Sequence, residues 1–286
     1  MENNFDSIWR VAHGRTINIG SIALIMAIVN VTPDSFSDGG NYLFLEKAID
    51  YAINCLEEGA DIIDIGGEST RPDSVPISAK EEQRRIIPVI EELSARTDAI
   101  ISVDTYRSET AELAINAGAH IINDVYGLQH DKNMAKTIAK YAAGVCIMHT
   151  GRNRKKLLDV FEDQFYFLKN SLKIAFNEGI SRDSIVIDPG FGFEKDTQEN
   201  LSIIAEFSKL MKFNFPILVG VSRKRFLGEI TGRGKALDRD GSTAVANCFL
   251  RMSGAQIFRV HNVKINRDSL LITDAIMKNK NCAIQH

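Results

Sequence analysis

The stretch ALIMAIVN at residues 23–30 has the pattern that decides the fold. It is an almost continuous apolar run that ends on a polar side chain, Asn30. Such a run is typical of a strand buried on both faces, as in a parallel sheet covered by helices. Similar runs follow, separated by longer amphipathic segments: DIIDI (61–65), AIISVD (99–104), HIIND (120–124), GVCIMH (144–149), SIVIDP (184–189), PILVGVS (216–222) and QIFRVH (256–261). Eight such β/α repeats predict an α/β fold, a closed (β/α)8 TIM barrel.

The domain organisation follows from this pattern. Residues 21–286 are expected to form one barrel domain, because no linker rich in Pro, Gly or Ser interrupts them. Residues 1–20 are expected to be an N-terminal extension. Its apolar stretches flank His13 and Gly14, which predicts a short hairpin at the barrel floor.

The segments between the strands carry helix signals. Ser78 followed by Glu81 is a capping-box pattern ahead of EEQRRIIPVIEEL (81–93). Further helices are expected over residues 45–58, 108–117, 132–141, 160–178, 197–212, 242–252 and 266–278.

Charge and length argue against several classes of protein. Lys and Arg number 34 against 37 Asp and Glu, so the net charge of −3 gives no bulk attraction to nucleic acid or anionic lipid. The longest apolar run, from Ile22 to Val29, is far shorter than the ~20 residues that span a bilayer. The N-terminus lacks the basic start and apolar core of a signal peptide. We therefore expect no nucleic-acid or membrane partner.

The cysteines lie far apart and form no CxxC pair. They are Cys55, Cys146, Cys248 and Cys282. This spacing argues against a zinc ribbon, a redox pair or a secreted disulfide scaffold. A cytoplasmic location is expected.

A polar side chain stands at or just after the C-terminal end of each predicted strand. These residues are Asn30, Asp64 with Glu68, Asp104, Asn123, His149, Asp188, Ser222 with Lys224, and Arg259 with His261. In a (β/α)8 barrel these positions converge on one mouth, where active sites of the fold lie. Any one of them alone is explained equally well as a helix cap or turn former. All of them together favour a site.

The chemistry of these residues is mixed. Carboxylates and amides match the N–H and amino groups of a nitrogen-rich ring. Arg259 and His261 form a candidate anion clamp, close to where such barrels often bind phosphate. No Ser-His-Asp nucleophile motif, Walker loop or HExxH helix is present, so covalent catalysis is not indicated.

The same segments carry a family resemblance. NVTPDSFSDGG (30–40) and GGESTRPDS (66–74) resemble the first two loops of dihydropteroate synthases. VDTYR (103–107), INDVYG (122–127), IDPGFGF (187–193), VGVSRKRFLG (219–228) and FRVHNV (258–263) resemble the barrel-end motifs of that family, in the same order. The resemblance covers residues 20–265, and seven motifs in sequence are far more specific than a lone DPG or GG.

The resemblance implies a transferase that joins 6-hydroxymethyl-7,8-dihydropterin diphosphate to p-aminobenzoate and releases pyrophosphate, with Mg²⁺ as cofactor and a homodimer as assembly. It implies that the pterin ring is held by Asp104, Asn123, Asp188 and Lys224. It assigns the diphosphate to Asn30, Arg259 and His261, with Asn30 also contacting the metal. It assigns the p-aminobenzoate pocket to Phe36, Thr70, Pro72, Phe193 and Ser222. It assigns catalysis to Asp34, Arg71 and Lys224.

We expect a dissociative, SN1-like displacement from this substrate pair. Positive charge would develop on the pterin methylene while the leaving pyrophosphate is stabilised by magnesium, Arg259 and His261. Because water would capture such a cation, the loops at 30–40 and 66–74 are expected to close first, with Phe36 and Pro72 as a dry cover.

Other interpretations remain open for single residues. Phe36 and Phe193, taken alone, are more typical of buried packing residues, and only their motifs favour the site. Lys224, within SRKR (222–225), is by composition a solvated base, and its position after a buried strand favours the site instead. Two segments depart from the family pattern. MHTGRNRKK (148–156) replaces a methionine-rich, glycine-containing stretch, so its contacts are open and His149 is given no catalytic role. Asn262 follows His261 where the family has an acid.

Two other functions compete with the synthase. A methyltransferase that passes a methyl group from methyltetrahydrofolate to a corrinoid would share the ring pocket, but would not need Ser222-Arg223-Lys224 or the Arg259–His261 clamp. A non-catalytic pterin-binding paralogue would have no reason to keep the magnesium and diphosphate groups.

Overall fold

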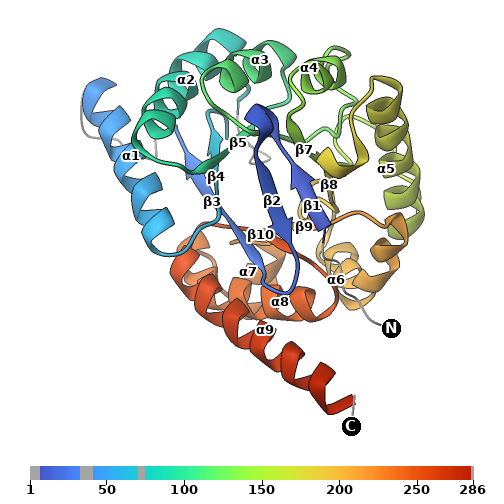
Figure 1. The fold of residues 1–286 in the computed structure, drawn as a ribbon. Coiled ribbons are helices and arrows are strands. Elements are labelled where there is room, and N and C mark those ends of the chain that lie inside the picture. Colours follow the sequence, from blue (N-terminus) through green and yellow to red (C-terminus); the bar gives the residue numbers. More distant parts are fainter. Residues whose placement is uncertain (1–6, 33–40, 70–74, 285–286) are drawn as a thin grey trace.

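The computed structural model describes residues 7–32, 41–69 and 75–284. Eight parallel strands form its central sheet, in the order β8-β7-β6-β5-β4-β3-β10-β9 (Figure 1). They are β3 (Leu24–Asn30), β4 (Ile62–Gly66), β5 (Ile100–Asp104), β6 (Ile121–Asp124), β7 (Gly144–Met148), β8 (Ile185–Asp188), β9 (Leu218–Val219) and β10 (Ile257–Val260). A parallel bridge between Ile187 and Ile217 joins the two edges, so the sheet is a nearly closed barrel. The predicted (β/α)8 fold is confirmed.

The register aligns the polar strand ends. Asn30 pairs with Gly66, Gly66 with Asp104, and Asp104 with Asn123. On the other side of the barrel Met148 pairs with Asp188. Parallel pairing without slippage therefore brings side chains that are distant in sequence to one level at the mouth.

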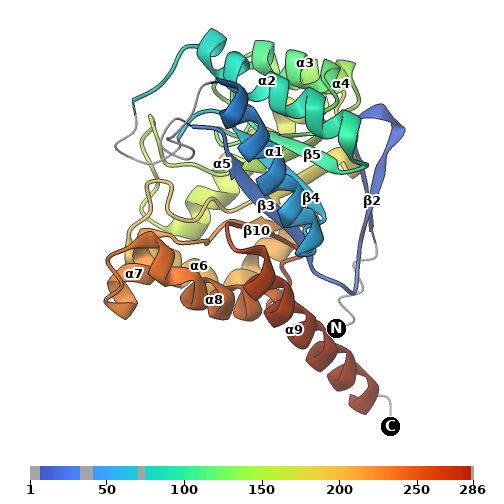
Figure 2. The same cartoon turned by 90° about the vertical axis from the view of Figure 1, so that its left-hand side faces the viewer.

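Helices surround the barrel (Figure 2). They are α1 (Asn41–Glu57), α2 (Ala79–Arg96), α3 (Ser108–Asn116), α4 (Met134–Lys140), α5 (Val160–Asn177), α6 (Thr197–Ala205), α7 (Arg225–Thr231), α8 (Asp240–Met252) and α9 (Val263–Ile284). Short 3-10 helices η1 (Ala12–Gly14), η3 (Arg182–Ser184), η4 (Phe207–Phe213) and η5 (Ala236–Arg239) lie between these elements. Among the described helices, none has both the length and the apolarity that crossing a membrane requires.

The predicted helices are correct in place but not always in extent. The single helix expected over 197–212 is wrong, because Glu206 leaves helical geometry (φ −115°, ψ 28°) and separates α6 from η4. Helix α7 was not predicted, because its seven residues are too short for an amphipathic period. The capping box is half formed: Ser78 Oγ accepts from Glu81 N at 3.2 Å, but the Glu81 carboxylate pairs with Arg84 and Arg85.

The predicted N-terminal hairpin is present. Strands β1 (Ser7–Arg10) and β2 (Thr16–Ile19) pair antiparallel. Trp9, Ile17 and Ile19 pack against side chains from the first residues of the barrel strands, such as Leu24 and Ile62. Trp9 Nε1 also donates to Ser184 O at 3.0 Å. The hairpin thus covers the barrel floor, opposite the polar mouth.

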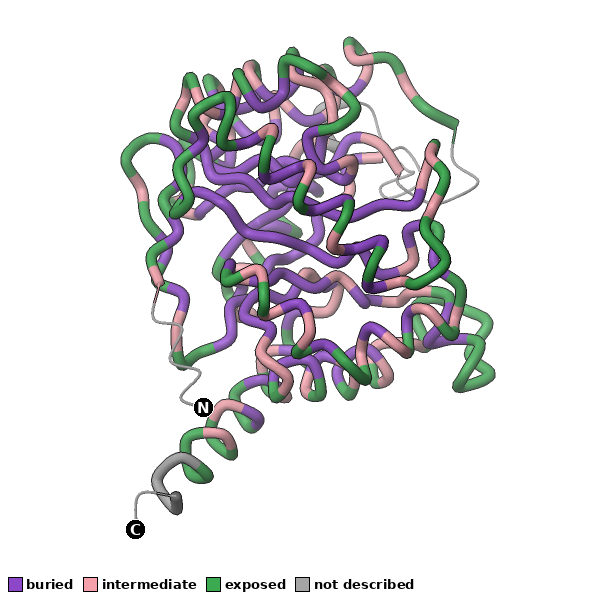
Figure 3. The backbone as a smooth tube through the Cα atoms, turned by 90° about the vertical axis from the view of Figure 1, so that its right-hand side faces the viewer, coloured by how far each residue is buried: buried purple, intermediate pink, exposed green. Residues whose placement is uncertain are grey.

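The main core lies between the barrel and its helices. Figure 3 shows the central strands as almost continuously buried, whereas buried and exposed residues alternate along the surrounding helices. All residues of β4 to β8 are buried, which explains their unbroken apolar runs.

Candidate active site

A buried cluster of acids, an amide and an arginine lies at the barrel mouth. Arg259 Nε donates to Asp64 Oδ2 at 2.6 Å, and its Nη2 donates to Asp104 Oδ2 at 2.8 Å. Asn123 Nδ2 donates to the same oxygen of Asp64 at 3.2 Å. The structure therefore brings the predicted Asp104, Asn123 and Arg259 together through Asp64. The sequence places Asp64 on the rim without indicating its role, and the one signal is a charged residue inside an otherwise apolar strand.

Two oxygen atoms in this cluster lack a partner. Asp64 Oδ1 and Asn123 Oδ1 are buried and have no hydrogen-bond partner among the described residues. A buried polar atom left in this state costs about 1–3 kcal/mol, and such atoms are rare in folded proteins. A ligand that donates hydrogen bonds would satisfy both oxygens.

Asp188 lies at the end of β8. Its Oδ1 accepts from Gly190 N at 2.7 Å, which fixes the carboxyl group. Burial raises the pKa of Asp188 to about 6, although the Gly190 amide and Lys224 both lower it. Burial likewise raises the pKa of Asp104 to about 7, against the effect of Arg259. These carboxyl groups therefore titrate close to neutral pH when no ligand is bound.

Lys224 and Phe193 form the next part of the wall. Lys224 Nζ lies 4.4 Å from the centre of the Phe193 ring, and Arg152 Cζ lies 4.5 Å from it. Phe193 is also packed against Val125 and Met148, as the packing interpretation of this residue predicts. Burial, followed by Arg259, lowers the pKa of Lys224 to about 8. Lys224 is half-buried at the mouth rather than fully solvated.

Ser222 and His261 are joined by two hydrogen bonds. Ser222 Oγ lies 2.9 Å from His261 Nδ1 and accepts from His261 N at 3.1 Å. The hydroxyl can donate to Nδ1 or accept a second bond from Nδ1–H, so the tautomer of the imidazole decides the direction of this bond. Burial, followed by Arg223 and Arg259, lowers the pKa of His261 to about 3. The imidazole is therefore neutral at physiological pH.

The loop after β8 is held by side chains from several elements. Gly190 and Gly192 have φ of +66° and +77°, and a Cβ on Gly190 would lie 1.9 Å from His149 O, so the DPGFGF motif requires glycine there. Gln164 donates to Pro189 O at 2.8 Å, and the buried Lys195 ammonium donates to Gly190 O at 2.8 Å. These contacts position Asp188 and Phe193.

The atypical segment after β7 supports the same loop. Gly151 N donates to Phe193 O at 3.3 Å, and Lys156 Nζ donates to Glu194 O at 2.5 Å. His149 is buried and bonds Asp163 of α5 at 3.0 Å. Burial, followed by Lys195, lowers the pKa of His149 to about 3. The segment therefore holds the pocket wall from behind.

Asn30 ends β3 and is half-buried at the mouth. A Cβ added to Gly66 would lie 3.5 Å from Asp104 Cβ and 3.8 Å from Asn30 Oδ1, so the amide lies near the acids across a glycine. No group of three or more His, Cys, Asp or Glu arranged as metal ligands is found within residues 7–32, 41–69 and 75–284.

Five predicted site residues lie outside the described residues: Asp34, Phe36, Thr70, Arg71 and Pro72. The chain on both sides of residues 70–74 is anchored by Arg107. Its Nη2 donates to Glu68 Oε2 and to Ile77 O, both at 2.8 Å. The ion pair with Glu68 and the hydrogen bond to Ile77 O together fix a residue on either side of that range.

A barrel whose mouth combines buried carboxylates and an amide with a basic wall is typical of enzymes that bind a polar, nitrogen-rich ring. The family model described as "Pterin binding enzyme" matches residues 26–261. The chain therefore belongs to the pterin-binding enzyme family, and within it to the dihydropteroate synthases, as the relatives show.

The sequence relatives share most of their length with this chain. It is 41% identical over 256 residues to a dihydropteroate synthase of Streptococcus pyogenes serotype M6, covering 89% of this chain and 96% of the relative. It is 42% identical over 241 residues to the enzyme of Bacillus subtilis, covering 84% of each.

Solved structures agree with this assignment. The dihydropteroate synthase of Clostridium difficile, crystallised in the presence of pteroic acid, matches with a TM-score of 0.88 and 42% identity, covering 91% of this chain and 98% of that chain. The Xanthomonas albilineans enzyme with 4-aminobenzoic acid matches with a TM-score of 0.89 and 38% identity, covering 94% and 98%. The same enzyme in complex with 7,8-dihydropteroate matches with a TM-score of 0.85 and 38% identity, covering 93% and 97%. The resemblance inferred from the motifs is confirmed.

Proposed function

We propose that this chain is a transferase of folate biosynthesis that joins 6-hydroxymethyl-7,8-dihydropterin diphosphate to p-aminobenzoate, giving 7,8-dihydropteroate and pyrophosphate. The observation that carries the proposal is the buried mouth cluster, in which Asp64 Oδ1 and Asn123 Oδ1 have no hydrogen-bond donor among the described residues. A pterin ring supplies ring N–H and amino donors of this kind. The Xanthomonas albilineans relative solved with 4-aminobenzoic acid and with 7,8-dihydropteroate supports the same substrate pair.

The pterin ring would bind Asp104, Asn123, Asp188 and Lys224. A carboxylate accepts from a ring N–H and an amino group at once, which a neutral side chain of the same size cannot do. With Oδ1 already fixed by Gly190 N, Asp188 is oriented before the ligand arrives. Asp64 would take part through its free oxygen and through Asn123 and Arg259, which it holds.

The diphosphate would bind Asn30, Arg259 and His261. When the bond between the methylene carbon and the diphosphate oxygen breaks, negative charge accumulates on the leaving pyrophosphate. The permanent charge of Arg259 and a ring N–H of neutral His261 would stabilise this charge without reorganisation. Burial disfavours the charge on Arg259, but Asp64 and Asp104 together favour it more strongly. The pKa of Arg259 therefore lies above its usual value, and the side chain remains a cation.

Magnesium fits this site as an ion that arrives with the diphosphate. Mg²⁺ commonly keeps several waters and takes one or two protein oxygens together with substrate phosphates. Asn30 offers one such oxygen at the mouth, close to Asp104. When bound, the ion would neutralise charge on the leaving group. Calorimetry should show tighter binding of the pterin diphosphate with Mg²⁺ than with a chelator, and no such difference for the pterin alone.

The second substrate, p-aminobenzoate, would bind against Phe193 and Ser222 on the described wall. Its amine would attack the cation left on the pterin methylene, and Lys224 lies within this part of the mouth. Phe36, Thr70 and Pro72 would complete the pocket, and Asp34 and Arg71 would help to close it against water. A dry, closed site is what a reactive cation requires.

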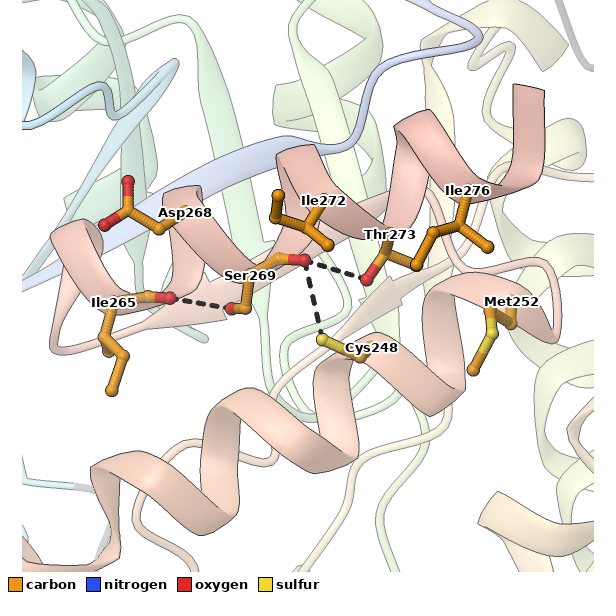
Figure 4. Close-up of a pocket in the computed structure, with 8 residues that line it drawn as sticks. All are labelled: Cys248, Met252, Ile265, Asp268, Ser269, Ile272, Thr273 and Ile276. Carbon is orange, nitrogen blue, oxygen red and sulfur yellow. Dashed lines mark hydrogen bonds between the residues drawn. The ribbon is translucent and has the colours of Figure 1, made fainter. Parts of the chain in front are cut away.

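The chain would act as a homodimer in the cytoplasm. An apolar groove between α8 and α9 is lined by Cys248, Met252, Ile265, Ile272 and Ile276 (Figure 4). Ile272 is 64% exposed, and Val245, on the same pair of helices, is 72% exposed. Apolar side chains gathered in this way mark an interaction surface, and a second copy related by a twofold axis is its proposed occupant. The described cysteines Cys55, Cys146 and Cys248 are free thiols, as a reducing compartment would keep them.

The test is an omission series with the purified protein. Dihydropteroate, measured by chromatography, should form only when pterin diphosphate, p-aminobenzoate and magnesium are all present. Turnover of methyltetrahydrofolate with a corrinoid protein would favour the methyltransferase instead. Pterin binding without any turnover would favour the non-catalytic paralogue.

A further inference from the structure

Arg223 separates two residues of the proposed site, Ser222 and Lys224, and has a left-handed backbone. Its φ is +58°, a conformation that costs a residue with a side chain about 1–2 kcal/mol. The turn directs the neighbouring residues to the mouth while the Arg223 side chain bonds to α8. Such a turn persists only if its surroundings hold it.

The turn is held at three points. Arg223 N donates to Thr243 Oγ1 at 3.0 Å, and Arg239 Nη1 donates to Arg223 O at 3.0 Å. The guanidinium forks onto Asp240, the first residue of α8, with Nε 2.6 Å from Oδ1 and Nη2 2.9 Å from Oδ2. A two-pronged pair of this kind fixes orientation as well as distance.

The same carboxylate also reaches the neighbouring strand end. Asn262 Nδ2 donates to Asp240 Oδ2 at 3.0 Å, and Asn262 follows His261 directly. Asn262 is fixed in turn, because its Oδ1 accepts from Ile265 N at 3.2 Å and its O accepts from Asn266 Nδ2 at 2.7 Å. Asp240 therefore ties the turn after β9 to the turn after β10.

We propose that Asp240 is a positioning residue of the active site. Through Arg223 and Asn262 it fixes Ser222 and Lys224, which follow β9, relative to His261, which follows β10. The inference rests on the proposed function, because these three residues are placed in the substrate pocket there. In the motif that this chain resembles, an acid follows the histidine. In this chain Asn262 stands there, and the acid comes from α8 instead.

The charges around Asp240 show why one acid is needed. Arg223 lies against it, and the cations Lys224 and Arg259 lie on the pocket side of His261, so the region is rich in positive charge. An amide at position 240 has a single acceptor oxygen, so the Arg223 side chain loses one of the two bonds that hold it on α8. The side-chain anchor of the left-handed turn is then weaker. Ser222 is no longer held firmly at its 2.9 Å contact with His261.

The experiment compares three variants with the wild type by steady-state kinetics, calorimetry with the pterin diphosphate and thermal unfolding. Asp240→Asn removes the charge with no change of shape. Asp240→Asn with Asn262→Asp returns one acid to the cluster from the other side. Asp274→Asn is the matched control, because Asp274 of α9 pairs with Arg251 of α8 at 2.5 Å, away from the residues proposed for the site.

Asp240→Asn should lower kcat/KM roughly 10- to 100-fold and weaken diphosphate binding. The exchange variant should recover most of this loss. The control should lower the unfolding temperature and leave kcat/KM unchanged. If Asp240→Asn fails to fold, Asn262→Ser serves instead: serine still caps α9 but is too short to reach Asp240. A smaller loss of kcat/KM is expected in this variant, because the Arg223–Asp240 pair remains.

The inference is overturned if Asp240→Asn behaves like the control, or if the exchange variant recovers stability without recovering kcat/KM. A wild type that forms no dihydropteroate would instead contradict the proposed function itself, so the two failures are distinguishable.

Discussion

The guanidinium of Arg259 lies against the carboxylate of Asp64, with Nε 2.6 Å from Oδ2. The cation proposed to bind the diphosphate is therefore already paired with an acid of the ring-binding floor. This makes the two halves of the pocket one electrostatic unit, in which a change to either half alters the other.

Replacing Arg259 should destabilise the fold. Arg259→Met leaves Asp64 and Asp104 buried without their counterion, and breaking a buried pair costs about 3–5 kcal/mol. Urea denaturation at pH 8 should show this loss, and the loss should shrink at pH 5, where Asp104, with a pKa of about 7, is protonated. Arg10→Met, which removes the exposed pair with Asp183, should cost less than about 1 kcal/mol. Equal losses in the two variants would contradict the buried pairing.

Pterin affinity should depend on pH through the raised pKa values of the acids. Asp104, with a pKa of about 7, and Asp188, with a pKa of about 6, must lose their protons to accept hydrogen bonds from the ring. Affinity should therefore fall below pH 7 and approach about tenfold per pH unit below pH 6 for each acid that titrates. Calorimetry from pH 5 to 8 measures this. In Asp188→Asn the slope below pH 6 should fall to about half, because only Asp104 still titrates there. Affinity that does not change with pH would argue against both acids as ligands.

Stability in mild acid should depend on His120 at the barrel floor. Its Nδ1 accepts from Ile101 N at 3.1 Å, and burial, followed by His13, lowers its pKa to about 4. An unfolded histidine binds its proton near pH 6.5, so between pH 6.5 and 4 the unfolded state holds more protons. The free energy of unfolding should fall there by up to about 1.4 kcal/mol per pH unit, level off below pH 4 and show no such loss above pH 6.5.

His120→Asn is the comparison for this effect, since an amide oxygen also accepts from Ile101 N. Chemical denaturation of both proteins across the same pH range isolates the histidine from other groups. If the difference between the two proteins does not change with pH, His120 is not the group responsible.

The proposed dimer should depend on the groove between α8 and α9. Ile272→Asp places a charge on this apolar surface in both copies at once, because a twofold interface repeats each change. Sedimentation velocity should show a shift to monomer. Leu158→Asp, at a fully exposed position ahead of α5, should sediment like the wild type. If the Ile272→Asp variant is still a dimer, the groove between α8 and α9 is not the interface.

The strands could be predicted from the sequence because burial on both faces left unbroken apolar runs that end on polar residues, as in β4 with Asp64 inside it. The ends of the helices were harder to predict from the sequence than the strands. Nothing in the sequence around Glu206 indicates the break after α6, and α7 has only seven residues. Tertiary contacts decide both.

The polar rim could be predicted because strand ends in this fold share one mouth. Its pairings could not, because they depend on which side chains meet across the barrel. Arg259 and Asp64 are 195 residues apart in sequence, and Ser222 and His261 are 39 apart. The role of Asp240 was missed for the same reason: it reads as an exposed helix start until the structure places Arg223 and Asn262 against it.

The most direct test of the account measures pyrophosphate and dihydropteroate in one reaction, for the wild type and for folded Asp188→Asn. We predict that the wild type releases the two products in equal amounts, only when p-aminobenzoate is present, and that the variant loses both together. Pyrophosphate released without dihydropteroate, or an unchanged rate in the variant, would contradict the claim that this barrel mouth joins a pterin to p-aminobenzoate.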